Sequence, residues 1–101
     1  MAEWFPEGTP TEEGASLKHG EMYFAYVLRS LKDGTHYYGS TSDMDKRLQE
    51  HNSGKVKYTK GHRPYVLHHI EQFETKEKAG KRERFFKTIA GYNWLKQNKI
   101  I

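Results

Sequence analysis

The sequence contains no cysteine, so no disulfide framework holds the chain together and a reducing compartment is permitted. Proline is scarce, and two of the three prolines lie within the first ten positions. No apolar run approaches the roughly 20 residues that span a membrane, or the core of a signal peptide. We therefore expect a soluble, cytoplasmic protein of one domain, which at 101 residues can bury a modest core.

Acidic residues are few over most of the chain. Residues 22–101 hold 16 Lys and Arg against 8 Asp and Glu, whereas residues 1–21 hold five glutamates and one lysine. A folded body this basic predicts a polyanionic partner, most simply DNA, and association with the nucleoid. A surface that is merely well solvated is the alternative on charge alone.

The first 21 residues are rich in Pro, Gly and Glu and show no apolar period. Such a composition cannot bury a core. We predict that 1–21 is a disordered acidic tail, dispensable for the folded domain, which we place at 22–101.

Patterning from Met22 onward predicts the element order ββαβα with a short C-terminal helix. Residues 22–31 are almost continuously apolar or aromatic, as expected for a central strand covered on both faces. Asp33-Gly34 predicts a two-residue hairpin turn, followed by a returning strand. The predicted strands are 22–31, 35–41 and 65–73. The fold class is therefore α+β, with a small three-stranded, mainly antiparallel sheet flanked by helices.

The first predicted helix covers 43–52. Ser42 is placed to cap it, with Asp45 at the reciprocal position of a capping box. Met44 and Leu48 lie one turn apart and form an apolar stripe.

The second predicted helix covers about 76–89, with Thr75 as its cap and Gly91 at its end. Its apolar positions include Ala79, Phe86 and Ile89. The remaining 94–101 are expected to form a short closing helix or tail.

The hairpin register predicts which side chains share a face of the sheet. A two-residue turn pairs Leu28 with Gly39 and Ser30 with Tyr37. Tyr26 then lies on the same face as Tyr37, because cross-strand partners share a face. Gly39 leaves a gap between them that another group can enter. Ordinary strand tyrosines, chosen for β-propensity, are the alternative.

Three charged or titratable residues occupy suggestive helical positions. Arg47 and His51 are four residues apart and project from one face of their helix. Glu83 lies three residues before Phe86, on or beside the buried stripe. A carboxylate there needs an arginine, a hydrogen-bond network or a metal ion as its partner.

The loop 55–63 is basic and contains one aromatic residue, Tyr58. This mixture suits phosphate contacts combined with base stacking, although a solvated loop is equally compatible with it. The basic side chains are Lys55, Lys57, Lys60 and Arg63.

Taken together, these residues resemble the GIY-YIG nuclease family. The first family motif appears as Ala25-Tyr26-Val27 and the second as Tyr37-Tyr38-Gly39, with ten residues between Tyr26 and Tyr37. The helix arginine, helix histidine and later glutamate of the family match Arg47, His51 and Glu83. The chain looks most similar to the small stand-alone bacterial members, which resemble the nuclease domain of the excision-repair nuclease.

The resemblance implies a metal-dependent DNA endonuclease acting in repair, recombination or mobile-element processing. Glu83 would hold one Mg²⁺ or Mn²⁺, and Arg47 would contact the scissile phosphate. Tyr26, Tyr37 and His51 remain open as the general base. A nucleic-acid-binding module of the same fold, with little or no cleavage, is the alternative.

Two positions depart from the family pattern. Ser40 stands where the repair nucleases have a lysine, and the late asparagine of the family has no unique match between Asn93 and Asn98. An assisting cation is therefore missing after the second motif.

Overall fold

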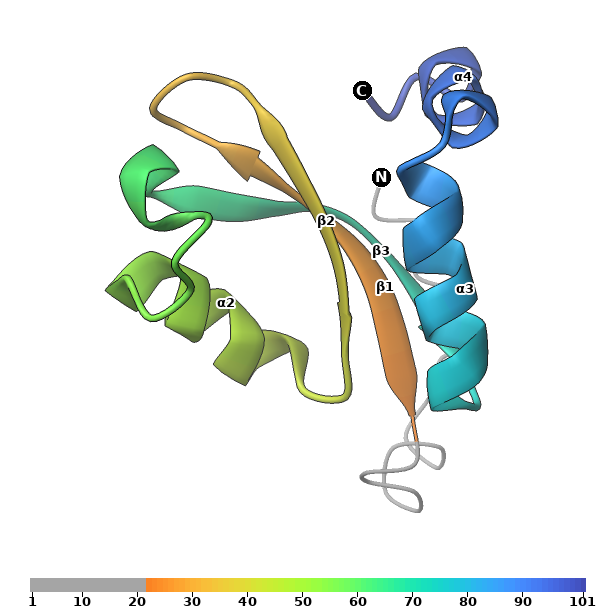
Figure 1. Ribbon diagram of the computed structural model, residues 1–101, viewed down its shortest axis with the longest axis horizontal. Helices are drawn as coiled ribbons and strands as arrows, with labels where there is room; N and C mark the ends of the chain where they lie inside the picture. Colours follow the sequence, from red (N-terminus) through yellow and green to blue (C-terminus); the bar gives the residue numbers. More distant parts are fainter. Residues whose placement is uncertain (1–21) are drawn as a thin grey trace.

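The structure is a computed structural model in which residues 22–101 are described (Figure 1). The predicted tail 1–21 lies outside the described residues. One antiparallel sheet forms in the order β2-β1-β3 and confirms the α+β class and the ββαβα order. The elements are β1 Tyr23–Ser30, β2 His36–Thr41, α2 Met44–Ser53, the 3-10 turn η2 Lys60–His62, β3 Tyr65–Phe73, α3 Lys76–Phe86 and α4 Ile89–Gln97.

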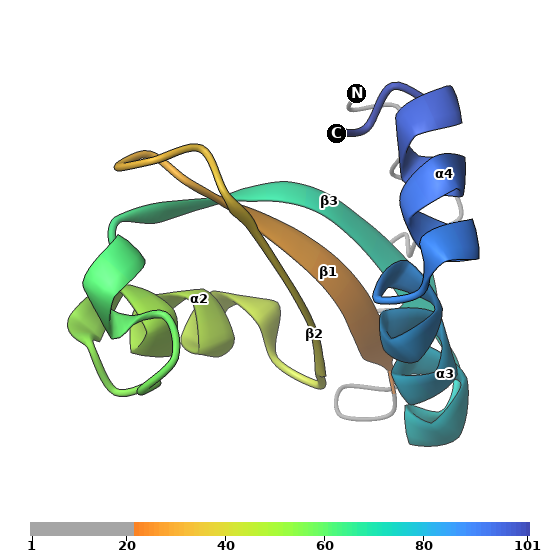
Figure 2. The same ribbon diagram turned by 45° about the horizontal axis from the view of Figure 1, so that its top comes forward.

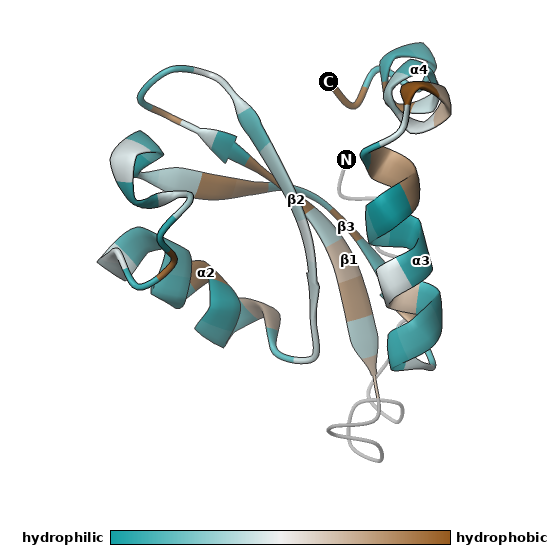
Figure 3. Cartoon of the chain, in the orientation of Figure 1, coloured by the Kyte–Doolittle hydropathy of each residue, from teal (hydrophilic) through white to brown (hydrophobic). Residues whose placement is uncertain are grey.

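The sheet is covered on both faces, with α2 on one side and α3 and α4 on the other (Figures 1 and 2). Residues 25–28 of the central strand β1 are almost completely buried, which confirms the prediction from the continuous apolar run. Figure 3 shows this apolar centre against the hydrophilic outer surfaces of α2 and α3. Full burial of each large apolar side chain contributes about 1.5–3 kcal/mol.

Two separate clusters fill the two sides of the sheet. Residues of α2 pack on Tyr26 and Leu28, while α3 and α4 pack on Ala25 and Val27. The α2 cluster contains Tyr26, Leu28, Tyr65 and Ile70, with Met44 and Leu48 against it. The predicted apolar stripe of α2 is therefore confirmed.

The predicted two-residue hairpin turn is wrong. A longer loop, whose tip is 31–34, joins β1 to β2, so Tyr26 pairs with Gly39 and Leu28 with Tyr37. The register is shifted by two positions from the predicted pairing. Because side chains alternate with a period of two, such a shift leaves every side chain on its predicted face.

The longer loop has a local cause in Ser30. Its hydroxyl accepts hydrogen bonds from the N–H groups of Lys32 and Asp33, both at 3.1 Å, which starts the turn early. The Asp33 carboxylate then accepts from the N–H of Thr35 at 3.1 Å. Gly34 supplies the left-handed conformation that closes the loop, with φ 79°.

The predicted cap of α2 is wrong by one residue. Asp43, rather than Ser42, caps the helix, and its carboxylate accepts from the N–H of Lys46 at 3.1 Å. Asp45 lies in the first turn, where its charge favours the helix N-terminus. Gly54 ends the helix in the left-handed conformation.

The second predicted helix, 76–89, is wrong in its last turn. Thr75 caps α3 as predicted, but α3 ends at Phe86. Thr88 then adopts an extended conformation and caps α4, its hydroxyl accepting from the N–H of Gly91 at 3.0 Å. Gly91 therefore lies inside a helix instead of ending one.

Close packing between the two helices explains this break. Gly91 is buried against the end of α3, and a Cβ built on it would lie 1.8 Å from the carbonyl oxygen of Phe85. Leu95, one turn later, enters the core completely. Ile89, predicted to be a core position, is 80% exposed because the new helix turns it outward.

We expect Gly91→Ala to destabilise the protein by about 3 kcal/mol, because the new methyl group meets backbone that cannot yield without moving a helix. Gly61→Ala is the matched control, since a Cβ at Gly61 meets no atom within 4 Å. Urea unfolding of both variants tests this. Equal stabilities would show that α3 and α4 separate easily.

The rotation of α3 about its axis is set by Arg82. Its Nε donates to the Glu71 carboxylate on β3 at 2.7 Å, and its guanidinium lies 4.4 Å from the ring centre of Trp94 and 4.8 Å from that of Phe85. With Arg82 held against β3 and α4, the next residue, Glu83, faces β2. The ion pair thus orients a predicted site residue.

Candidate active site

The site is built around the hydroxyl of Tyr26. This side chain lies over Gly39, where a Cβ would stand only 2.4 Å from the phenol oxygen. The gap predicted at Gly39 therefore exists, and Tyr26 itself fills it. Tyr37 lies on the same face as predicted, with its ring centre 6.5 Å from that of Tyr26.

His51 is completely buried and touches both tyrosines. Its Nε2 lies 3.0 Å from the Tyr26 hydroxyl, and its Nδ1 lies 2.9 Å from the hydroxyl of Thr59. Thr59 donates its own proton to the carbonyl of Val56 at 3.3 Å. Its oxygen must then accept from Nδ1–H, which leaves Nε2 to accept the proton of Tyr26.

Arg47 stands beside the same phenol. Burial raises the pKa of Tyr26 to about 12, while hydrogen bonding to Arg47 and its positive charge oppose that rise. Arg47 also donates from Nη1 to the Glu50 carboxylate at 2.9 Å, and both side chains of this pair are partly exposed. A pair of this kind contributes little to stability, so a phosphate can compete for the guanidinium.

Glu83 approaches the site from the other side of β2. One carboxylate oxygen accepts from the hydroxyl of Ser40 at 2.8 Å, and the other pairs with the ammonium of Lys87 at 2.8 Å. The charge of Glu83 also contributes to raising the pKa of Tyr26, so the carboxylate is within electrostatic reach of the phenol.

The salt bridge of Glu83 is weak, because the Lys87 side chain is 50% exposed. Among the described residues, no group of three or more acidic, histidine or cysteine side chains is arranged to hold a metal. The oxygen donors at Glu83 and Ser40 suit a hard cation that keeps most of its waters, as Mg²⁺ does. The residues therefore fit a single Mg²⁺ and do not fit a two-metal site.

Two open depressions meet at Ser40. One, of about 420 Å³, contains Arg47 and Glu50, and the other, of about 800 Å³, contains Glu83. Since both include Ser40, the arginine and the glutamate face one continuous concave surface across β2. The five predicted site residues, Tyr26, Tyr37, Arg47, His51 and Glu83, thus converge, while their catalytic roles stay predictions.

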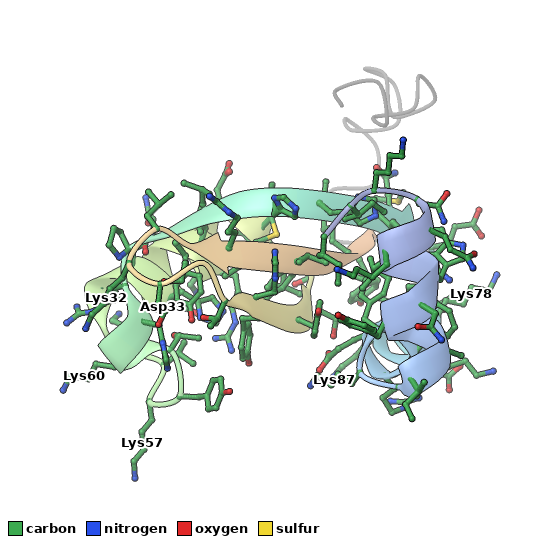
Figure 4. The ribbon with its side chains drawn as sticks, turned by 90° about the horizontal axis from the view of Figure 1, so that it is seen from above. Lys32, Asp33, Lys57, Lys60, Lys78 and Lys87 are labelled. Atoms are coloured by element: carbon green, nitrogen blue, oxygen red, sulfur yellow. The ribbon has the colours of Figure 1, made fainter. Side chains whose placement is uncertain are left out.

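The basic loop 55–63 borders this surface through Tyr58. The Tyr58 ring is 71% exposed and lies 5.7 Å from the ring of Tyr37. Lys57 and Lys60 project from the loop toward solvent (Figure 4). Lys55 is exposed as well.

Arg63 is the least free of the four predicted phosphate contacts. Its Nε donates to the carbonyl of Lys60 at 2.9 Å, and its guanidinium lies against Gly54. Arg63 therefore fastens the loop to the end of α2, and a phosphate contact by this residue stays a prediction.

Thr59 and Ser40 are site residues that the sequence reasoning missed. Thr59 is completely buried inside an otherwise basic loop, and a lone threonine there carries no sequence signal. The sequence marks Ser40 only as the place of a missing lysine. In the structure Lys87, from the end of α3, places a cation beside Glu83, so the charge absent at position 40 is supplied from elsewhere.

Burial and the charge of Arg47 lower the pKa of His51 to about 4. Unfolded histidine titrates near pH 6.5, so the unfolded chain binds a proton that the folded chain excludes. We expect stability to be complete above pH 6.5 and to fall as the pH drops to 4, by up to about 1.4 kcal/mol per unit.

Urea unfolding between pH 4 and 7.5 tests this, with His51→Gln as the comparison. The wild type should lose more stability than the variant, whereas the lowered pKa of His36 acts on both. An NMR titration showing that His51 protonates near pH 6.5 in the folded protein would contradict the prediction.

The family to which the chain belongs agrees with this geometry. A model described as the GIY-YIG catalytic domain matches residues 22–96, so the chain belongs to the GIY-YIG family. Membership supports a nuclease-type function with nucleic acid as the partner. It also confirms the resemblance that the motifs had indicated.

Similar proteins carry the name UPF0213. One from Bacillus pumilus is 44% identical over 83 residues, covering 81% of this chain and 76% of that protein. Another, from Halobacterium salinarum, is 41% identical over 70 residues, covering 68% and 90%. The solution NMR structure of the UPF0213 protein BH0048 from Bacillus halodurans is 36% identical, covers 77% of this chain and 85% of its own, and aligns with a TM-score of 0.47.

Among the helices described within residues 22–101, none is both long and apolar enough to cross a bilayer.

Proposed function

We propose that the protein is a metal-dependent endonuclease that hydrolyses phosphodiester bonds in DNA. One observation carries the proposal: the Tyr26 hydroxyl contacts His51 and Arg47 directly and lies within electrostatic reach of Glu83. A purely structural tyrosine in a strand would not need a buried histidine, a guanidinium and a carboxylate around it. The basic body of the chain suits a polyanionic substrate.

Arg47 would bind the scissile phosphate. Its planar fork of donors matches two phosphate oxygens and stabilises the negative charge that develops during hydrolysis. Glu83 would hold Mg²⁺ or Mn²⁺, which supplies Lewis acidity when bound. Ser40 and Lys87 fix the orientation of the Glu83 carboxylate.

Tyr26 and His51 would act together as the base. A water that attacks the phosphorus gives its proton to the Tyr26 oxygen, while the Tyr26 proton moves to Nε2 of His51. A phosphate bound at Arg47 neutralises the charge that lowers the pKa of His51, so His51 becomes a better proton acceptor when substrate is present. The departing 3′-oxygen takes a proton from solvent.

In the cell this activity would serve DNA repair, recombination or the processing of mobile elements, in association with the nucleoid. A binding module without cleavage remains the second candidate, favoured by the Glu50 carboxylate that holds Arg47 in the resting protein.

The test is incubation of purified protein with labelled single-stranded, duplex and branched DNA, in Mg²⁺, in Mn²⁺ and in EDTA. We expect cleavage in either metal and none in EDTA. Tight binding without cleavage of any substrate in either metal would favour the binding module.

A further inference from the structure

The larger depression beside the site extends along α3, beyond the residues that the family motifs contain. Its cations come from this helix: Lys76, Lys78, Lys81 and Arg84. Ser40 and Glu83 form the end that adjoins the site, and Glu77 is the other acidic residue of the lining. Figure 4 shows Lys78 pointing away from the body of the molecule, which leaves Lys76, Lys81 and Arg84 as the cations of the groove.

These three side chains have no ion pair and no side-chain hydrogen bond with any residue in the described range 22–101. By contrast, Arg47, Arg82 and Lys87 all have carboxylate partners. Unpaired cations gathered in one concave surface raise the local potential and attract a polyanion.

Gly80 keeps this surface open. A Cβ at Gly80 would meet only the guanidinium of Arg84, at 3.5 Å, so no backbone packing requires glycine there. Glycine inside a helix costs about 0.5–1 kcal/mol relative to alanine. The sequence accepts that cost at a position where a smooth floor lets another chain approach α3.

We infer that the groove along α3 binds the phosphates of the substrate strand on the Glu83 side of the scissile bond. The inference rests on the proposed action on DNA. Lys76 and Arg84 are eight positions apart, about 12 Å along the helix, which spans about three nucleotides of a duplex strand. The strand would continue past Ser40 to Arg47, and the loop with Lys57 and Lys60 lies on the far side of the site (Figure 4).

The test measures DNA binding by the variant Lys76→Ala/Arg84→Ala. Fluorescence anisotropy with a labelled 20-nucleotide strand and its duplex, in EDTA to prevent cleavage, gives the affinity at several salt concentrations. The matched control is Lys96→Ala/Lys99→Ala, which removes the same charge from the exposed surface at the C-terminal end.

We expect the groove variant to lower the slope of log affinity against log salt by about 1.4 units for the single strand and about 1.8 for the duplex, since two phosphate contacts are lost. The control should change the slope by less than about half a unit. Unchanged melting temperatures would establish that the variants fold, as expected for exposed side chains.

Equal losses in the two variants, or no binding of DNA by the wild type, would overturn the inference. Its failure is distinct from failure of the nuclease proposal. A protein that never cleaves but needs Lys76 and Arg84 for binding would retain the groove and lose the nuclease. A protein that cleaves normally with the groove neutralised would keep the nuclease and lose the groove.

Discussion

Replacing Glu83 by glutamine is expected to abolish Mg²⁺-dependent cleavage while the fold and most DNA binding survive. The amide keeps the size of the side chain and still accepts from Ser40, so packing beside Ala79 and Phe86 is preserved. The charge that binds the metal is lost. Because a catalytic metal contributes several kcal/mol to transition-state stabilisation, the rate should fall by at least about 10³.

Glu77→Gln is the matched control for this variant, since Glu77 lies on the same helix and lines the same depression. Cleavage rates in Mg²⁺ and melting temperatures are measured on both. The bond from Lys87 to Glu83 is a half-exposed surface pair, worth about 0.2–1 kcal/mol, so its loss should barely move the melting temperature. Wild-type cleavage by Glu83→Gln would show that the proposed mechanism is wrong.

Arg47→Ala is expected to reduce turnover by about 10²–10³ with only a modest loss of DNA binding. Negative charge on the phosphate oxygens develops mainly in the transition state, so an aimed guanidinium acts chiefly on the chemical step. Removing Arg47 also removes the charge that holds down the pKa values of both Tyr26 and His51. The phenol then becomes harder to deprotonate, which adds to the loss of rate.

Lys46→Ala is the control for Arg47→Ala. Lys46 is the neighbouring cation and lines the same depression, but it is exposed and lies about 100° around the helix axis from Arg47. Single-turnover cleavage and anisotropy on both variants separate rate from binding. If both variants lose affinity equally and neither loses turnover, Arg47 is an ordinary phosphate contact with no special part in the reaction.

The sequence reasoning succeeded where a side chain's place depends on a short period. Tyr26 and Tyr37 share a face because strand side chains alternate, and even a register shift of two left that result intact. Arg47 and His51 share a helix face for the corresponding reason. The errors came at boundaries: the first strand's turn, the cap of α2 and the break after Phe86.

Those boundaries were decided by contacts that several residue types satisfy equally well. Asp43 and Ser42 are both good caps, so the sequence alone could not choose between them. The break before Thr88 depends on Gly91 meeting the carbonyl of Phe85, an encounter between two helices that only the folded chain contains.

By itself, the sequence determined the fold class, the order of the elements, the basic body and the five candidate site residues, because these follow from local periods and from motif spacing. The tertiary structure decided what those residues do to one another. Only folding buries His51 between Tyr26 and Thr59 and so assigns its tautomer, since neither partner is near it in the chain's local geometry. Likewise, whether Glu83 meets Ser40 depends on the rotation of α3, which a distant ion pair of Arg82 sets.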